Sequence, residues 1–163
     1  MLTFTRSILA ALALAAVATP STSFAEQPAA VPSAAGVVRL HSANSFDETL
    51  ARLKADVQAK GIRYFDTIDQ SGLGASAELD LGRSTLVLFG NPPLGVQFLQ
   101  SNRYSGLDWP VRMLVIEEAD GSVYVAWTDF AYIADRYAIS DKGPQFKMAS
   151  EVAASIATAA TAK

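Results

Sequence analysis

Apolar side chains near the start of the folded region recur at a helical spacing. Four of them lie three or four positions apart and so share one helix face: Phe46, Leu50, Leu53 and Val57. Ahead of this face Ser45 and Glu48 form a capping box, in which each side chain can bond a free backbone N–H group. Gly61 follows as a stop signal, because glycine accepts the left-handed conformation that ends helices. The pattern predicts a helix between Ser45 and Gly61.

Short runs of β-branched and aromatic residues predict strands elsewhere in the chain. They occupy residues 36–40, 62–68, 85–89, 111–118 and 123–129. The third run, TLVLF, is continuously apolar, which is typical of a strand that is covered on both faces. Residues 70–77, between the second and third runs, include two glycines and are expected to form a loop.

The last two runs predict a β-hairpin. Asp120 and Gly121 lie between them, and Asp-Gly is a strong signal for a two-residue turn. That turn fixes which residues face each other across the hairpin. The expected pairs are Leu114 with Trp127, Ile116 with Val125, and Arg112 with Asp129.

Three further helices complete the pattern. Asn91 and Pro92 predict the start of a short helix, because proline suits the first helical position. Residues 102–110 are expected to be irregular, and residues 131–137 and 145–160 to be helical. The main elements run strand, helix, two strands, helix, two strands, helix. We therefore predict an α+β fold with one mostly antiparallel sheet of about five strands and helices packed on one face.

The N-terminus has the order of a secretory signal peptide, residues 1–25. Arg6 precedes an apolar run over residues 7–18, which is shorter than the roughly 20 residues that span a bilayer. We expect cleavage after Ala25, no stable membrane anchor afterwards, and a periplasmic or secreted protein; the alternative is an uncleaved anchor. Residues 26–36 are then a flexible tether and residues 37–160 a single domain.

The composition argues against several classes of function. With 13 basic and 16 acidic side chains the chain has a net charge of −3, which disfavours nucleic-acid binding. It has no cysteine, so thiol catalysis and thiolate metal sites are absent. The one histidine, His41, stands alone in the sequence, and no common catalytic or metal-binding motif occurs. We therefore expect no cofactor and no metal, and we assign no catalytic residue.

A rigid stretch rich in proline and glycine joins the third predicted strand to the fourth. It is a poor phosphate cradle, because Pro92 and Pro93 remove backbone N–H groups that would bind an anion. Trp109-Pro110 is a candidate for a cis peptide bond. If the strands are ordered as expected, polar residues converge at one rim as a candidate ligand site: Asn91, Gly95, Asp108, Arg112 and Asp129. The alternative is structural, with a cross-strand ion pair, a helix cap and a loop contact.

The predicted hairpin is apolar on both faces. Its second face would carry Met113, Val115, Tyr124 and Ala126, whereas a sheet with helices on one side usually has a polar opposite face. We expect something to cover these candidate interface residues: a second copy of the chain, a protein partner or an apolar ligand. The alternative is that the last helix wraps around the sheet, or that the sheet closes on itself.

Short motifs are spread along residues 37–160. They are Ser45-Phe46-Asp47-Glu48-Thr49 with Leu53, Gly61, Ile68-Asp69, Leu88-Phe89-Gly90-Asn91-Pro92, Gly106-Leu107-Asp108-Trp109-Pro110-Val111-Arg112, Asp120-Gly121 and Thr128-Asp129. Together they resemble the uncharacterised family called domain of unknown function 302. The resemblance implies a small α+β domain that is dimeric and occurs alone or joined to other modules. It implies no reaction.

Departures from the family pattern favour binding over catalysis. Gln70 stands where such proteins often have histidine, Gly95-Val96 replaces Gly-Thr, and Phe130 replaces proline. Each change makes its region more apolar or less reactive. The sequence thus predicts a non-catalytic binding or assembly module that acts as a homodimer, with a small molecule or another protein as a further partner. The alternative is an enzyme or small-molecule sensor whose site is the polar rim described above.

Overall fold

The computed structural model describes residues 31–32 and 36–163. The predicted signal peptide lies outside these residues, as does most of the predicted tether. Val31–Pro32, within the tether range, forms a short strand, β1. No helix in the described part of the chain is long and apolar enough to cross a membrane.

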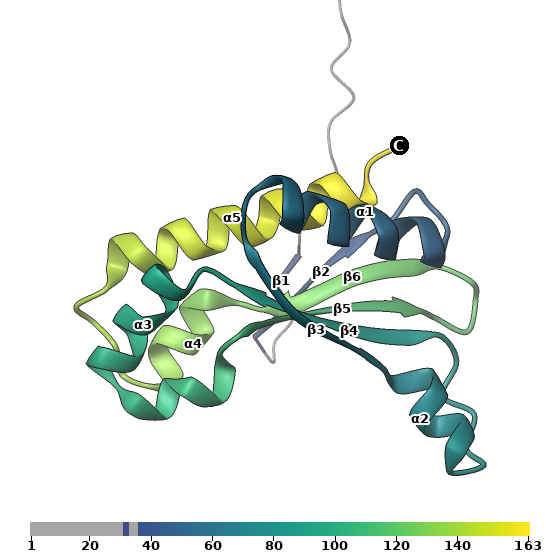
Figure 1. The fold of residues 1–163 in the computed structure, drawn as a ribbon, viewed down its shortest axis with the longest axis horizontal. Helices are drawn as coiled ribbons and strands as arrows, with labels where there is room; N and C mark the ends of the chain where they lie inside the picture. The colour runs from purple at the N-terminus through teal and green to yellow at the C-terminus, as the bar shows by residue number, and fades with distance from the viewer. Residues whose placement is uncertain (1–30, 33–35) are drawn as a thin grey trace, which may run out of the picture.

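One antiparallel sheet forms the centre of the molecule (Figure 1). Its strands lie in the order β1-β2-β6-β5-β4-β3, and each pairs antiparallel with its neighbours. The five longer strands are β2 (Val37–His41), β3 (Arg63–Asp69), β4 (Ser84–Gly90), β5 (Val111–Glu117) and β6 (Val123–Thr128). The predicted α+β fold is confirmed, and β1 adds two residues at one edge.

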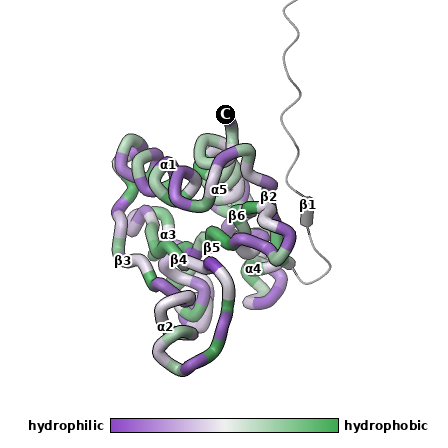
Figure 2. The backbone as a smooth tube through the Cα atoms, turned by 90° about the vertical axis from the view of Figure 1, so that its right-hand side faces the viewer, coloured by the Kyte–Doolittle hydropathy of each residue, from purple (hydrophilic) through white to green (hydrophobic). Residues whose placement is uncertain are grey.

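Two helices, α1 (Phe46–Ala59) and α5 (Gly143–Thr161), lie side by side on one face of the sheet (Figures 1 and 2). The start of α1 is as predicted, because the Ser45 side chain accepts a hydrogen bond from the backbone N–H of Glu48. Its end is also as predicted: Gly61 follows the helix with a φ of 65°, which favours glycine. The apolar faces of both helices pack into the core against the sheet.

Three short helices gather at one end of the sheet: α3 (Pro92–Ser101), the 3-10 helix η1 (Arg103–Asp108) and α4 (Phe130–Arg136). Asn91 occupies the position before α3, but its side chain makes no capping hydrogen bond. The η1 turn lies where irregular structure was expected. It is stabilised by the side chain of Asn102, which accepts from the backbone N–H of Tyr104. The bond between Trp109 and Pro110 is cis.

The loop predicted for residues 70–77 is wrong, because most of it forms the helix α2 (Gln70–Ser76). Glycines disfavour helices in general. Here the side chain of Asp69 caps the helix by accepting from the N–H of Gly72 at 3.0 Å. Figure 1 shows α2 projecting from the end of β3 and β4, on the side of the sheet away from α1 and α5.

The predicted hairpin register is wrong by one residue. Met113 faces Trp127, and Val115 faces Val125. The turn is longer than Asp-Gly alone: the N–H of Gly121 donates to the carbonyl of Glu118, and the N–H of Glu118 to the carbonyl of Ser122. Gly121 has a φ of 83°, so the connection is a three-residue loop that ends in a left-handed glycine.

This shift exchanges the two faces of β5, since side chains alternate along a strand. Met113 and Val115, predicted as interface residues, are fully buried in the core instead. Leu114 and Ile116, predicted to share a face with Trp127 and Val125, are half-buried on the opposite face. Tyr124 and Ala126 do lie on that opposite face.

Candidate functional site

Asp108 is the centre of a polar cluster at the η1 end of the sheet. Its side chain is only 4% exposed. The carboxylate forms a salt bridge with Arg112 and a second, at 3.3 Å, with Nη1 of Arg136. The hydroxyl of Tyr137 donates to Oδ2 of Asp108 at 2.6 Å. One carboxylate therefore joins η1 to β5 and to the end of α4.

The hydrogen bond to Asp108 raises the pKa of Tyr137 above its ordinary value, and burial adds to this effect. The phenol thus remains a neutral donor at physiological pH. Arg112 and Arg136 keep 41% and 49% of their side chains exposed. Two guanidinium groups share one carboxylate, so the cluster presents net positive charge to solvent. Because both carboxylate oxygens are already bound, Asp108 is better suited to holding the fold than to proton transfer.

The five predicted ligand-site residues are divided between three places. Asp108 and Arg112 meet, as expected. Arg112 does not pair with Asp129: it lies beside Leu88 of β4, and Asp129 instead caps α4 by accepting from the N–H of Ala131. The one-residue shift of the hairpin register is the cause. Arg136 and Tyr137 were missed, because nothing in the sequence links them to a carboxylate 28 and 29 positions earlier.

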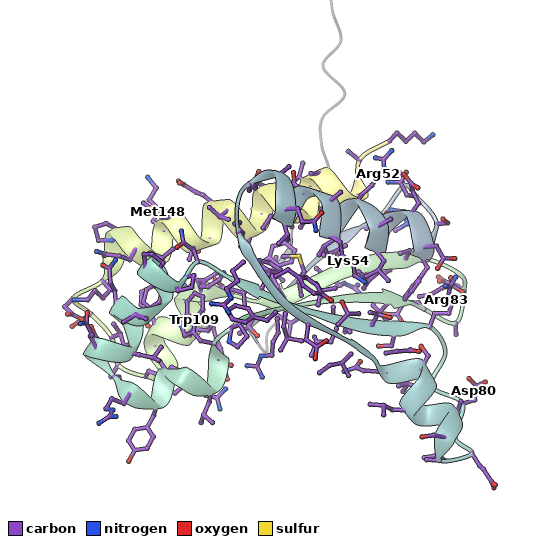
Figure 3. All side chains as sticks on the ribbon, viewed as in Figure 1. Arg52, Lys54, Asp80, Arg83, Trp109 and Met148 are labelled. Carbon is purple, nitrogen blue, oxygen red and sulfur yellow. The ribbon has the colours of Figure 1, made fainter. Side chains whose placement is uncertain are left out.

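Asn91 and Gly95, the other two predicted residues, lie beside the indole ring of Trp109. A Cβ atom at Gly95 would be 3.3 Å from that ring, so glycine lets α3 pack closely against it. Trp109 also stacks on Phe98, with ring centroids 5.2 Å apart. Asn91 and Trp109 line an apolar pocket of about 360 Å³ between α3, α5 and the sheet. Figure 3 shows Trp109 at this end of the molecule, with Met148 on α5 above it.

The face of the sheet opposite α1 and α5, which we call the outer sheet face, carries a group of apolar side chains, with Arg112 and Asp66 beside Leu88. Its half-buried apolar side chains are Ile68, Leu86, Leu88, Leu114, Ile116, Tyr124 and Ala126. Figure 1 shows α1 and α5 on the other side of the sheet, and α4 and α2 at opposite ends of this side. Of the four predicted interface residues, Tyr124 and Ala126 lie on this face, and Met113 and Val115 lie in the core.

The segment of residues 70–82, which we call the α2 arm, carries a second set of exposed apolar side chains. Leu73, Leu79 and Leu81 are 61%, 67% and 56% exposed. The arm projects on the same side as the outer sheet face, and Figure 2 shows it at the far end of the molecule from α1 and α5. Nothing in the sequence indicated this surface, because the segment was expected to be a loop.

His41 lies at the edge of the outer sheet face. Its ring meets the ring of Tyr124 edge-on, with centroids 5.2 Å apart. Among the residues that the structure describes, no group of three or more His, Cys, Asp or Glu side chains could hold a metal ion.

Comparison with known proteins identifies the family. The model of the family described as "Domain of unknown function DUF302" matches residues 38–162. The chain belongs to this family. A crystal structure of an uncharacterized conserved DUF302 protein from Bacillus stearothermophilus has the same fold: its TM-score is 0.71 at 14% sequence identity, over 78% of this chain and 99% of that one.

Curated relatives of this DUF302 chain are longer proteins. The fluoride-specific ion channel FluC 1 of Brucella suis is 34% identical over 104 residues, which are 64% of this chain and 41% of that protein. The fluoride-specific ion channel FluC 1 of Brucella abortus is also 34% identical over 104 residues, 38% of its length. The chain thus spans about two-fifths of the curated relatives that it matches.

Proposed function

We propose that this DUF302 chain is an exported, non-catalytic binding and assembly domain that acts as a homodimer. The observation that carries the proposal is the outer sheet face, with the exposed leucines of the α2 arm beside it. An antiparallel sheet that faces water on one side normally has polar side chains there. Contiguous exposed apolar surface in a soluble protein marks an interaction site.

The outer sheet face is continuous across four strands. Ile68 lies beside Leu86, Leu86 beside Leu114, and Leu114 beside Ala126. Such a row presents an apolar strip about four strands wide, roughly 15 Å from the first strand to the last. That surface suits a second sheet, because two sheets pack well through apolar faces.

A second copy of the chain fits this surface for two reasons. First, the leucines of the α2 arm extend beyond their own sheet and need a neighbour to cover them. Second, the margins of the face have opposite charge: exposed Arg39 lies in β2 and exposed Asp66 in β3. A two-fold axis parallel to the strands would place each β2 opposite the β3 of the other copy, and so bring the margin that contains Arg39 close to the margin that contains Asp66.

The name of the Brucella relatives suggests a setting for such a domain. They are called fluoride-specific ion channels, and most of their length lies outside the match. We propose that the segment they share with this chain is a binding or assembly domain, and we do not propose channel activity for this chain.

Native mass spectrometry of the protein expressed from Met1 onward tests the proposal. We expect a dimer at micromolar concentration, of chains cleaved near Ala25. The double variant Leu79→Asp/Leu81→Asp should be a folded monomer, because both side chains are exposed in the single chain. Met148→Asp/Ser155→Asp is the matched control: both residues are exposed on α5, which packs on the opposite face of the sheet, and the variant should stay dimeric.

A wild-type protein that is monomeric at micromolar concentration would contradict the proposal. Equal dissociation of the arm variant and the control would contradict the choice of interface. Val115→Asp is unsuitable as an interface variant, because its side chain is fully buried and the charge should unfold the domain.

A further inference from the structure

The apolar pocket beside Trp109 is independent of the outer sheet face. It lies on the helix side of the sheet, where Leu94 of α3, Met148 of α5 and Val111 of β5 contribute to its wall. Its volume of about 360 Å³ is sufficient for a small molecule, since ligand pockets usually start near 300 Å³. A dimer formed through the outer sheet face leaves it open.

The wall of the pocket contains small residues where larger ones would fill it. Ala149 and Ala153 are buried on α5 and line the cavity. Protein interiors are otherwise packed with few voids, and filling such a void generally stabilises a protein. Met148, at the same wall, is 54% exposed, and its flexible thioether side chain can adapt to an apolar guest.

Two side chains at the pocket, Asn91 and Lys60, offer hydrogen-bond donors. The indole N–H of Trp109 is fully buried and is not one of the donors that the pocket exposes. The side chain of Asn91 makes no capping bond. The ammonium group of Lys60 bonds Asp56 at 2.5 Å, which occupies one of its three N–H donors. Among the described residues that line the pocket, Lys60 and Asn91 are the polar side chains apart from the indole.

We propose that this pocket binds a small aliphatic monocarboxylate, of the class of a medium-chain fatty acid. The apolar wall takes the hydrocarbon chain, and the carboxylate accepts hydrogen bonds from the donors at the pocket, with Lys60 supplying positive charge. A nucleotide does not fit this chemistry, because the lining offers one cation and no phosphate cradle. The proposal does not depend on the homodimer.

Isothermal titration of the full-length protein with sodium decanoate tests the assignment. We expect saturable binding of one decanoate per chain. Decyltrimethylammonium has the same hydrocarbon chain with a cationic head, and it should bind at least about tenfold more weakly, the effect of one lost charge-assisted hydrogen bond. The Leu79→Asp/Leu81→Asp variant should bind decanoate as the wild type does.

Two pairs of variants locate the site. Lys60→Gln should weaken decanoate binding about tenfold, whereas Lys147→Gln should not. The two lysines are matched, because each is paired with a carboxylate four residues away in its helix, and Lys147 does not line the pocket. Met148→Glu should also weaken binding, and Ser155→Glu, which adds the same charge at another exposed position of α5, should not.

Absence of decanoate binding at millimolar concentration would overturn the proposal. So would equal effects of Lys60→Gln and Lys147→Gln, or equal affinity for the cationic amphiphile. None of these results would bear on the dimer, whose test is the mass of the assembly.

Discussion

At the scale of single residues, Asp108 is the side chain with the most connections in the candidate site. Two guanidinium groups and one phenol bind a carboxylate that is almost completely buried. A buried charge is costly unless it is paired and hydrogen-bonded. A substitution that disrupts these bonds is therefore expected to lower the free energy of unfolding. The sequence marked Asp108 as a site residue, and the structure indicates that its main role is to hold three elements together.

Asp108→Asn is expected to lower the free energy of unfolding by about 2 kcal/mol, because bonds to a charged acceptor become bonds to a neutral one. Asp129→Asn is the matched control. It removes the same charge, but asparagine caps a helix as well as aspartate does, so its stability should be nearly unchanged. Urea denaturation measures both. Equal effects of the two substitutions would show that Asp108 is not the structural centre described here.

The stability that Tyr137 contributes to the same cluster depends on pH. Its pKa is raised in the folded state by the hydrogen bond to Asp108, so the folded protein holds the phenolic proton more tightly than the unfolded chain does. The resulting stability is present below the ordinary tyrosine pKa of about 10 and is lost as pH rises through the higher folded value. Thermal melts should show that Tyr137→Phe lowers the Tm at pH 8, and that the difference from wild type shrinks at more alkaline pH. A constant difference would argue against this linkage.

At the scale of elements, the β5–β6 turn decides which residues enter the core. One additional loop residue moves Met113 and Val115 inward and Leu114 and Ile116 outward. The turn depends on Gly121, whose φ of 83° is unfavourable for residues with a Cβ atom. A local backbone preference thus sets the composition of the outer sheet face.

Gly121→Ala is expected to cost about 1 kcal/mol of stability through this backbone strain alone, since nothing lies within 4 Å of the added Cβ. Gly143→Ala is the control, because its site is equally open, its φ is not left-handed, and alanine favours the helix that it begins. It should be neutral or slightly stabilising by chemical denaturation. Equal stability of the two variants would contradict the turn geometry.

At the scale of the whole molecule, two surfaces lie on opposite sides of one sheet. The helix side contains the pocket beside Trp109, and the other side presents the outer sheet face with the α2 arm. This separation allows a ligand and a second copy to bind together. It also means that each can be removed by substitution without disturbing the other.

The proposed homodimer has a thermodynamic consequence beyond its mass. Association that occurs only in the folded state stabilises it by mass action, so the Tm should rise with protein concentration. In the Leu79→Asp/Leu81→Asp variant the Tm should be independent of concentration over the same range. A wild-type Tm that does not change with concentration would count against assembly at these concentrations.

The sequence by itself determined the elements and the fold class. The signals that predicted them are local: the capping box at Ser45, the spacing of Leu53 and Val57, and the apolar runs of the strands. Such predictions hold in the structure because each pattern satisfies backbone groups or buries one face of an element within a few residues. The motifs around Asp108 likewise identified the family without reference to coordinates. The helix of the α2 arm escaped detection because one capping side chain, Asp69, outweighed the glycines that indicated a loop.

Only the tertiary structure decided how the pieces combine. The hairpin register depends on whether the turn has two loop residues or three, and Asp120-Gly121 is compatible with both. The turn has three, and this difference of one residue exchanges the faces of β5. Asp108 contacts Arg136 and Tyr137 because the end of α4 lies beside η1. These segments are distant in the sequence, so no periodic pattern of residues predicts the contact. The pocket arises in the same way, from the distance between α3 and α5 around Trp109. Long-range packing places side chains from separate elements together, and that placement carries the proposals of function.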